Sequence, residues 1–189
     1  PLWLHGNRLT IETMTIGISD QESTLIERAC EGADIEIAGF LHETLAAAET
    51  TLSYDERAMG VGLLDLGAGS SKLALFSGPI RYLAEIPLGA TNLTTDLSTV
   101  IQVSPTEAER LKLEIGLMAK NQTSDQMVKF NTTADRSNEM PTQQISEIIE
   151  ARQREIFELI RNKIDSSPQK TPLPAGIVLT GGGAMLKNI

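Results

Sequence analysis

The hydrophobic residues in the middle of the chain form three short runs separated by turns. The first run covers Val61–Leu66, the second covers residues 72–76, and the third covers Ile80–Ile86. Continuous apolar runs of this length, bounded by glycine, serine and proline, are typical of buried strands. Because the turns between them are short, the sequence predicts three consecutive strands that pair antiparallel.

Farther along the chain, apolar residues recur every three or four positions, which predicts amphipathic helices. The clearest helix covers residues 142–164, and its apolar positions are Ile145, Ile148, Ile149, Ile156, Leu159, Ile160 and Ile164. A second helix, residues 105–116, begins after a capping serine and buries Ala108, Leu111 and Ile115. A third follows Ala90, with Leu93, Leu97, Val100 and Ile101 facing inward.

The first third of the chain has weaker patterns. Residues 9–18 and 35–37 are strand candidates, and residues 39–52 form a helix candidate that leads into a polar connection at 53–59. Ser19 followed by Glu22 predicts a capping box and a helix after it. The apolar side of that helix consists of Leu25, Ile26, Ala29 and Cys30. We interpret Cys30 as a packed small hydrophobic residue rather than a nucleophile.

The last part of the chain contains a second strand that runs into glycines. Residues 121–140 are polar and are expected to form loops and short strands, one of them at 126–131. Residues 175–180 are expected to form a short buried strand, and Gly181, Gly182 and Gly183 then lead toward a helix at Ala184. Three consecutive glycines let a ligand approach the backbone closely.

The turn after Val61–Leu66 carries the first candidate chemistry. Gly67 and Gly69 allow the backbone N–H groups to line a concavity that suits a phosphate, and Asp65 could hold a hydrated metal ion beside it. An ordinary hairpin turn is the alternative. Glu109 and Lys112 stand three apart and so share one helix face, where the alternative is a surface ion pair.

Bulk composition narrows the class of protein. The 189 residues include 25 acidic and 16 basic side chains, a net charge of -9 that argues against a nucleic-acid-binding surface. One cysteine excludes an internal disulfide framework and is typical of a reducing compartment. No apolar run approaches the roughly 20 residues of a membrane span. The chain lacks an initiator methionine and stops after a glycine cluster, so we expect it to be a fragment.

Two strand-then-glycine turns with the Glu109 and Lys112 face between them resemble the second half of the actin-like ATPase superfamily. The first turn usually reads Asp-Ile-Gly-Gly-Gly-Thr-Thr in that superfamily, and here it reads Asp65-Leu66-Gly67-Ala68-Gly69-Ser70-Ser71. Ala68 would crowd a phosphate if its position needed a positive φ. Within the superfamily the chain is similar to the FtsA family of bacterial cell-division proteins over essentially its whole length. The supporting segments are Ser53-Tyr54-Asp55-Glu56-Arg57-Ala58-Met59-Gly60-Val61, Ile86-Pro87-Leu88-Gly89, Thr94-Thr95-Asp96-Leu97, Glu107-Ala108-Glu109-Arg110-Leu111-Lys112 and Ala175-Gly176-Ile177-Val178-Leu179-Thr180-Gly181-Gly182-Gly183.

The resemblance implies an α/β protein with an incomplete actin-like ATPase (ribonuclease H-like) fold, in which helices flank mixed sheets. Residues 1–18 would form the end of the family-specific inserted subdomain and the strand that leads back to the first lobe. Residues 19–59 would complete the inner part of the first lobe. Residues 60–90 and 141–189 would form the inner part of the second lobe, and residues 91–140 its outer part.

The resemblance also implies a site for ATP and Mg²⁺. Asp65 would act on the ion mostly through water, and the β- and γ-phosphates would lie against Gly67, Ala68, Gly69, Ser70 and Ser71. Glu109 and Lys112 would flank the adenosine, and Gly181, Gly182, Gly183 and Ala184 would form the floor beneath it. Glu43 occupies the spacing of the residue that orients the attacking water, whereas its position alone also fits a helix-start charge.

The implied function is that of a membrane tether for the division ring, with at most weak ATPase activity. Such a protein binds the C-terminal peptide of FtsZ through residues 91–140, self-associates into actin-like filaments and does not bind nucleic acid. It lies at the cytoplasmic face of the cell membrane at the division septum, through a C-terminal amphipathic helix absent from this chain. Two alternatives share the fold: a PilM-like pilus-assembly protein and a small-molecule kinase.

Overall fold

The computed structural model describes residues 7–8, 10–11, 13–118, 126–134, 136–167 and 170–189. The chain forms two compact units, Pro1–His42 and Glu43–Ile189. The predicted subdomain boundaries, at residues 1–18, 19–59, 60–90 with 141–189, and 91–140, stay predictions. Among the described residues, no helix is long and apolar enough to cross a membrane.

The first unit contains the predicted capped helix. Helix α1 covers Asp20–Glu31, and the Ser19 hydroxyl accepts a hydrogen bond from the Glu22 N–H at 3.2 Å, which confirms the capping box. The predicted apolar side is wrong, because Leu25 and Ile26 are exposed and no other helix or strand in the described part of this unit packs on it. The free thiol of Cys30 is half-buried.

The two strands predicted in the first unit are also wrong. The described residues of 9–18 and all of 35–37 have no strand structure, and residues 9 and 12 lie outside the described residues. A strand requires a neighbour that satisfies its backbone N–H and C=O groups. The described part of this unit provides no such neighbour.

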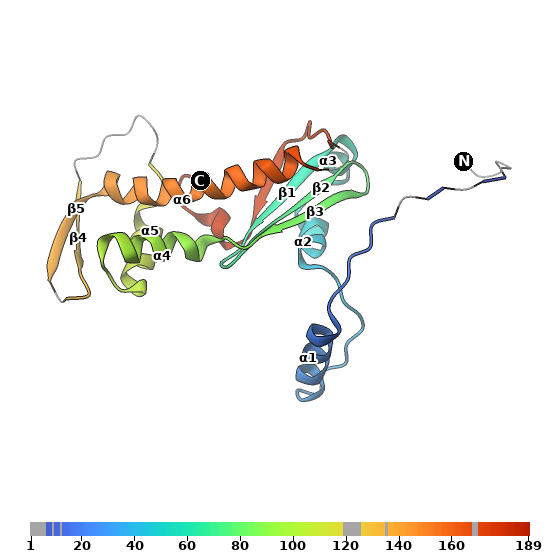
Figure 1. Ribbon diagram of the computed structural model, residues 1–189, viewed down its shortest axis with the longest axis horizontal. Coiled ribbons are helices and arrows are strands. Elements are labelled where there is room, and N and C mark those ends of the chain that lie inside the picture. Colours follow the sequence, from blue (N-terminus) through green and yellow to red (C-terminus); the bar gives the residue numbers. More distant parts are fainter. Residues whose placement is uncertain (1–6, 9, 12, 119–125, 135, 168–169) are drawn as a thin grey trace. The chain divides into compact units, whose positions relative to one another are not determined.

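The second unit is built on a four-stranded mixed sheet. Its strands are β1 (Val61–Leu66), β2 (Ser71–Phe76), β3 (Ile80–Ile86) and β6 (Ile177–Thr180), in the order β3-β2-β1-β6. β1 pairs antiparallel with β2, and β2 with β3, as predicted. β6 pairs parallel with β1 and lies at the edge (Figure 1). The expected burial of this strand is wrong, because Ile177 and Leu179 are exposed there.

Alternating side chains cover the two faces of the sheet. Val61 and Leu63 point to one face, where they pack with Ala48 and Leu52. On the other face, Leu64 and Leu66 join the larger core. This alternation explains why β1 is buried on both sides, since helices lie against both faces.

Helices α2 (Glu43–Thr51) and α3 (Tyr54–Met59) precede the sheet. The expected helix at 39–52 therefore begins later than predicted. The connection predicted at 53–59 is instead helix α3. The sequence contains a signal for this helix, because Ser53 followed by Glu56 is a capping-box pattern. The Ser53 hydroxyl accepts a hydrogen bond from the Glu56 N–H at 3.2 Å, and the Glu56 carboxylate accepts one from the Ser53 N–H at 2.7 Å.

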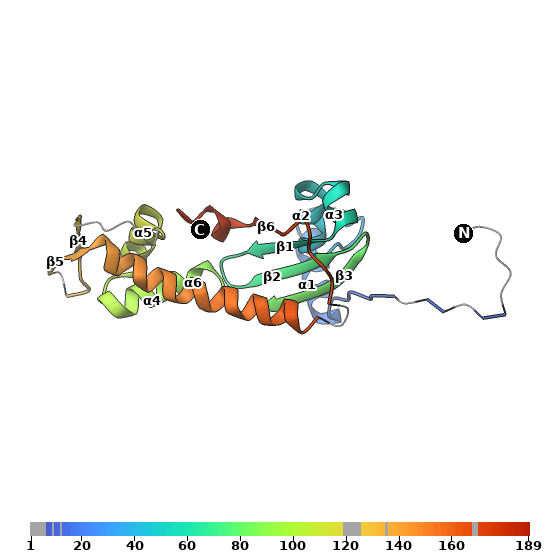
Figure 2. The ribbon, with the colours of Figure 1, turned by 90° about the horizontal axis from the view of Figure 1, so that it is seen from above.

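Of the three later helices, the long α6 (Thr142–Asp165) lies along the other face of the sheet, and α4 (Ala90–Ile101) and α5 (Pro105–Ile115) pack with it beyond the sheet (Figure 2). α6 runs from the hairpin of β4 (Met127–Asn131) and β5 (Ser137–Pro141) to the sheet (Figure 2). The helix faces are mostly as expected, except that Val100 is 61% exposed. Short strands were expected within 121–140, and β4 covers most of the one placed at 126–131, whereas no bounds were predicted for β5. Residues 121–125 of that stretch lie outside the described residues.

Candidate functional site

Both glycine turns lie at the same edge of the sheet. β1 and β6 are parallel neighbours, and Asp65 pairs with Thr180 at their carboxyl ends. The turn at residues 67–70 follows β1, and Gly181 follows β6 into the short 3-10 helix η1 (Gly182–Met185). Turns at the carboxyl ends of adjacent parallel strands are a frequent place for ligand binding in α/β proteins.

The first turn is fixed against the start of α4. The Gly67 N–H donates to the Ser70 carbonyl at 3.0 Å, and the Gly67 carbonyl accepts from the Ala90 N–H at 2.9 Å. A Cβ on Gly89 would lie 2.5 Å from that same carbonyl oxygen, so the contact requires glycine. The sequence predicted that Ala68 would crowd a phosphate only if its φ were positive. Its φ is not positive, so this condition is not met.

The second turn packs directly on the end of β1. Gly181 has φ 85° and ψ 171°, a conformation that essentially only glycine adopts. A Cβ there would lie 2.2 Å from Asp65 Oδ1, and one on Gly183 would lie 2.8 Å from the Leu66 carbonyl oxygen. These two glycines therefore allow the second turn to lie against Asp65 and Leu66 at the end of β1.

Glu109 and Lys112 form part of a half-buried polar network rather than a surface ion pair. Lys112 is only 5% exposed, and its Nζ lies 2.7 Å from Glu109 Oε2. The same ammonium donates to Thr94 Oγ1 at 3.0 Å and to the Ala90 carbonyl at 3.2 Å. Thr94 Oγ1 also donates to the Glu109 carboxylate. Burial raises the pKa of Glu109, but the hydrogen bonds from Lys112 and Thr94 outweigh it and hold the pKa below its usual value.

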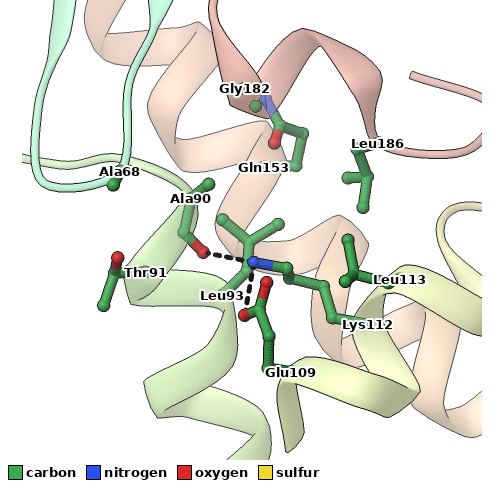
Figure 3. Close-up of a pocket in the computed structure, with 11 residues that line it drawn as sticks. Ala68, Ala90, Thr91, Leu93, Glu109, Lys112, Leu113, Gln153, Gly182 and Leu186 are labelled. Carbon is green, nitrogen blue, oxygen red and sulfur yellow. Dashed lines mark hydrogen bonds and ion pairs between the residues drawn. The ribbon is translucent and has the colours of Figure 1, made fainter.

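The network and the turns enclose one pocket of about 300 Å³. Figure 3 shows Glu109 and Lys112 on one side of it and Gly182 on the opposite side. The lining residues come from the first turn, from α4, α5 and α6, and from the segment after β6: Ala68, Ala90, Thr91, Leu93, Glu109, Lys112, Leu113, Gln153, Gly182, Gly183 and Leu186.

Five of the predicted site residues line this pocket: Ala68, Glu109, Lys112, Gly182 and Gly183. Asp65, Gly67, Gly69, Ser70 and Gly181 belong to the adjoining turns and strand end. Ala184 is in η1, where its N–H donates to the Gly181 carbonyl at 3.2 Å. The structure thus brings together predicted residues that are more than 100 positions apart in the sequence.

Ser71 is the exception among the predicted phosphate contacts. Its side chain is fully buried, and its hydroxyl donates to the Leu88 carbonyl at 2.7 Å. It therefore connects the start of β2 to the segment before α4 and is not accessible to a ligand in this structure.

Glu43 lies at the first turn of α2 and makes an ion pair that the sequence did not predict. Its Oε1 is 2.5 Å from Lys72 Nζ. The hydrogen bond that Lys72 donates to Glu43 is the main cause that raises the pKa of Lys72, and the charges of Glu85 and Asp65 add to it. Lys72 pairs with Asp65 across β1 and β2, so it connects Glu43 with the strand end that bears Asp65.

Sequence reasoning missed the apolar wall and two polar residues of the pocket, Thr91 and Gln153. Leu93 and Leu186 belong to no motif and look like ordinary core residues, whereas Leu113 lies off the predicted apolar face of its helix and is 61% exposed. Gln153 had a usable signal, because it stands in the buried row of α6 between Ile149 and Ile156. A polar residue in such a row requires a partner.

Comparisons with known proteins give the chain a family. The family profile "Cell division protein FtsA" matches residues 62–189. The FtsA of Bacillus subtilis is 36% identical over 193 residues, and that of Pseudomonas aeruginosa 30% over 191 residues. Both alignments cover 100% of this chain but only 43% and 46% of the relatives, so the chain spans less than half the length of these curated relatives.

Solved structures support the fold. The MreB5 protein of Spiroplasma citri bound to ADP aligns with a TM-score of 0.75 at 20% identity, over 92% of this chain and 57% of that one. The PilM-PilN pilus biogenesis complex aligns with a TM-score of 0.67 at 18% identity, over 89% of this chain and 43% of that one. The expected α/β actin-like fold is therefore confirmed, and the chain belongs to the FtsA family of bacterial cell-division proteins.

Proposed function

We propose that the full-length protein binds Mg²⁺-ATP in this pocket and uses it while anchoring the FtsZ ring to the cytoplasmic membrane. One feature of the molecule supports nucleotide binding most directly. The two glycine turns and the Glu109 and Lys112 network come from distant parts of the sequence and border the same cavity. The matching MreB5 structures bound to ADP and AMPPNP add support from proteins with the same fold.

The phosphates would lie at the first turn. The backbone N–H groups of Ala68, Gly69 and Ser70 donate no hydrogen bond within the described residues. Consecutive free N–H groups form a concavity that attracts anions. The adenosine would occupy the pocket, with the apolar side chains against the base and the Glu109 carboxylate as an acceptor for ribose hydroxyls.

Asp65 fits the proposed role beside Mg²⁺. Its carboxylate has no hydrogen bond or ion pair among the described residues, and only the charge of Lys72 on the next strand acts on it, so its oxygens are available for an ion or its waters. Carboxylate oxygens are preferred Mg²⁺ ligands, and the ion usually keeps several waters. Among the described residues no group of three or more His, Cys, Asp or Glu could hold a metal alone. The bound ion would supply charge neutralisation for the phosphates.

Hydrolysis, at most weak, would depend on Glu43 holding the attacking water. The ion pair with Lys72 fixes one carboxylate oxygen of Glu43, and its other oxygen has no ion-pair partner among the described residues. Positioning of water is the main demand that phosphoryl transfer makes on a side chain. Measured phosphate release should therefore fall in a Glu43→Gln variant without a matching loss of ATP affinity.

An isosteric substitution tests the nucleotide site. In the full-length protein, Asp65→Asn should weaken Mg²⁺-ATP binding by roughly tenfold and leave ATP binding in EDTA nearly unchanged, because only the ion contact is lost. Asp55→Asn, on the exposed side of α3, is the matched control and should bind like the wild type. Equal Mg²⁺-ATP affinity in wild type and Asp65→Asn would remove Asp65 from the site.

The partner is tested separately. We propose that residues 91–140 receive the FtsZ C-terminal peptide and that nucleotide-dependent self-association into filaments places many such sites at the septal membrane. The full-length protein should retain an immobilised FtsZ tail peptide but not a scrambled peptide of the same composition. Absence of retention by a folded protein would contradict the tethering function while leaving the nucleotide site intact. A substrate-dependent transfer of phosphate to a small molecule would favour a kinase instead.

A further inference from the structure

One buried side chain of the pocket has an unsatisfied hydrogen-bonding group. Gln153 is 5% exposed and stands in α6 among buried isoleucines. Its Nε2 atom is buried and has no hydrogen-bond partner in the described part of the chain. A buried amide without a partner is costly and uncommon in folded proteins, so its position calls for a ligand or another physical explanation.

The position of Gln153 indicates where such a partner would lie. The residue lines the pocket together with Gly182, Gly183 and Leu186. Figure 3 shows its amide end directed from α6 toward the Gly182 side, across the pocket from Glu109 and Lys112. Gln153 also borders a hollow along α6, but the walls of that hollow include Arg154, Glu158 and Arg161, whose charges favour water there.

We propose that Gln153 reads the purine base of the bound nucleotide and makes this pocket prefer adenine over guanine. The inference rests on the proposed nucleotide site and names the residue that decides its base specificity. The ribose and phosphates are the same in ATP and GTP. Discrimination between the two must therefore come from a group that contacts the base, and Gln153 is the polar side chain of the pocket on the side away from the ion pair.

The chemistry of a carboxamide matches adenine. Gln153 presents an N–H donor beside a C=O acceptor, and adenine presents its N7 acceptor beside its N6 donor. Both hydrogen bonds can form at once. Guanine presents two acceptors at this edge, O6 and N7, so one of them would face the Gln153 carbonyl oxygen. Rotation of the terminal amide exchanges the positions of its nitrogen and oxygen. The donor can therefore face N7 and the acceptor N6 for either orientation of the base.

A change in the ligand tests the inference without any change in the protein. In 7-deaza-ATP, a carbon replaces N7 and the N6 amino group is retained. We expect the full-length wild-type protein to bind ATP roughly tenfold more tightly than 7-deaza-ATP, and to prefer ATP over GTP by at least as much. Equal dissociation constants for ATP and 7-deaza-ATP would overturn the role of Gln153.

A variant assigns the effect to this side chain. Gln153→Leu should bind ATP and 7-deaza-ATP with nearly equal dissociation constants, because the group that contacts N7 is gone. Gln144→Leu makes the same chemical change at an exposed position of the same helix and should keep the full difference. A full difference retained in Gln153→Leu would refute the inference. Failure of the wild type to bind ATP would instead refute the proposed site itself, and this inference with it.

Discussion

The close contact between the second glycine turn and the end of β1 makes a sharp prediction about Gly181. Substitution by alanine should destabilise the second unit, because Gly181 has φ 85° and ψ 171° and its Cβ would lie 2.2 Å from Asp65 Oδ1. Two neighbouring glycines serve as controls. Gly176 also has a positive φ, 78°, but open space around its Cβ position, and Gly182 has open space without a positive φ.

The expected changes in the free energy of unfolding separate the cost of a positive φ from the cost of a clash at Cβ. Gly182→Ala should be neutral or stabilising by about 0.4–1 kcal/mol, because alanine lowers the entropy of the unfolded chain. Gly176→Ala places alanine in a left-handed conformation, which costs about 1–2 kcal/mol. The same reduction in unfolded-chain entropy offsets part of this cost, so stability should fall by roughly 0.5–1 kcal/mol. Gly181→Ala adds strain on the order of 1–3 kcal/mol and a clash with Asp65 and the Leu66 carbonyl, so we expect a net loss of roughly 2–4 kcal/mol.

Hydrogen exchange of the β1 and β6 amides in the full-length protein measures these changes locally. Protection in these strands reports the free energy of opening this part of the molecule, whatever other domains do. The free energy should fall in the order Gly182→Ala, Gly176→Ala, Gly181→Ala. A Gly181→Ala variant as stable as Gly182→Ala would show that the second turn does not pack on Asp65 as described.

Two further predictions concern groups around the site. Ser71→Ala should cost about 1 kcal/mol in urea unfolding, because the buried hydroxyl donates to the Leu88 carbonyl, whereas Ser70→Ala should cost less than about 0.5 kcal/mol. Equal costs would contradict this division. The lowered pKa of Glu109 contributes stability above its ordinary value of about 4.3, and this contribution is lost as pH falls through the lowered folded-state value. Glu109→Gln should therefore flatten the acid side of the stability profile, and an unchanged profile would exclude its pairing with Lys112.

The sequence predicted the sheet strands and long helices well, because their signals are local. The apolar runs of β1 and β3 end at glycines and prolines, and the periodicity of α6 extends over many turns. The motif residues of the site were predicted by resemblance, and the parallel pairing of β1 with β6 explains why they meet. That pairing joins segments about 115 positions apart, and no local pattern reveals it.

The predictions that were wrong or missing also depend on interactions between segments that are distant in the sequence. The expected strand at 35–37 has no pairing partner in the part of the chain that the structure describes, and the predicted burial of β6 was wrong because that strand is at the edge of this sheet. Ser71 was grouped with the phosphate contacts by its place in the motif, but the strand alternation turns its hydroxyl inward. Lys72 and Gln153 were missed, because their importance depends on what lies across the sheet or the pocket.

The central claim is that residues from both glycine turns and from α4 and α5 surround one nucleotide. Hydrogen exchange of the full-length protein with and without Mg²⁺-ATP tests it most directly. Four peptides should become protected from exchange when nucleotide binds: residues 66–71, 89–94, 109–113 and 180–186. Their protection should rise with the same midpoint nucleotide concentration. Nucleotide binding that protects other segments and leaves residues 180–186 unchanged would contradict the shared site.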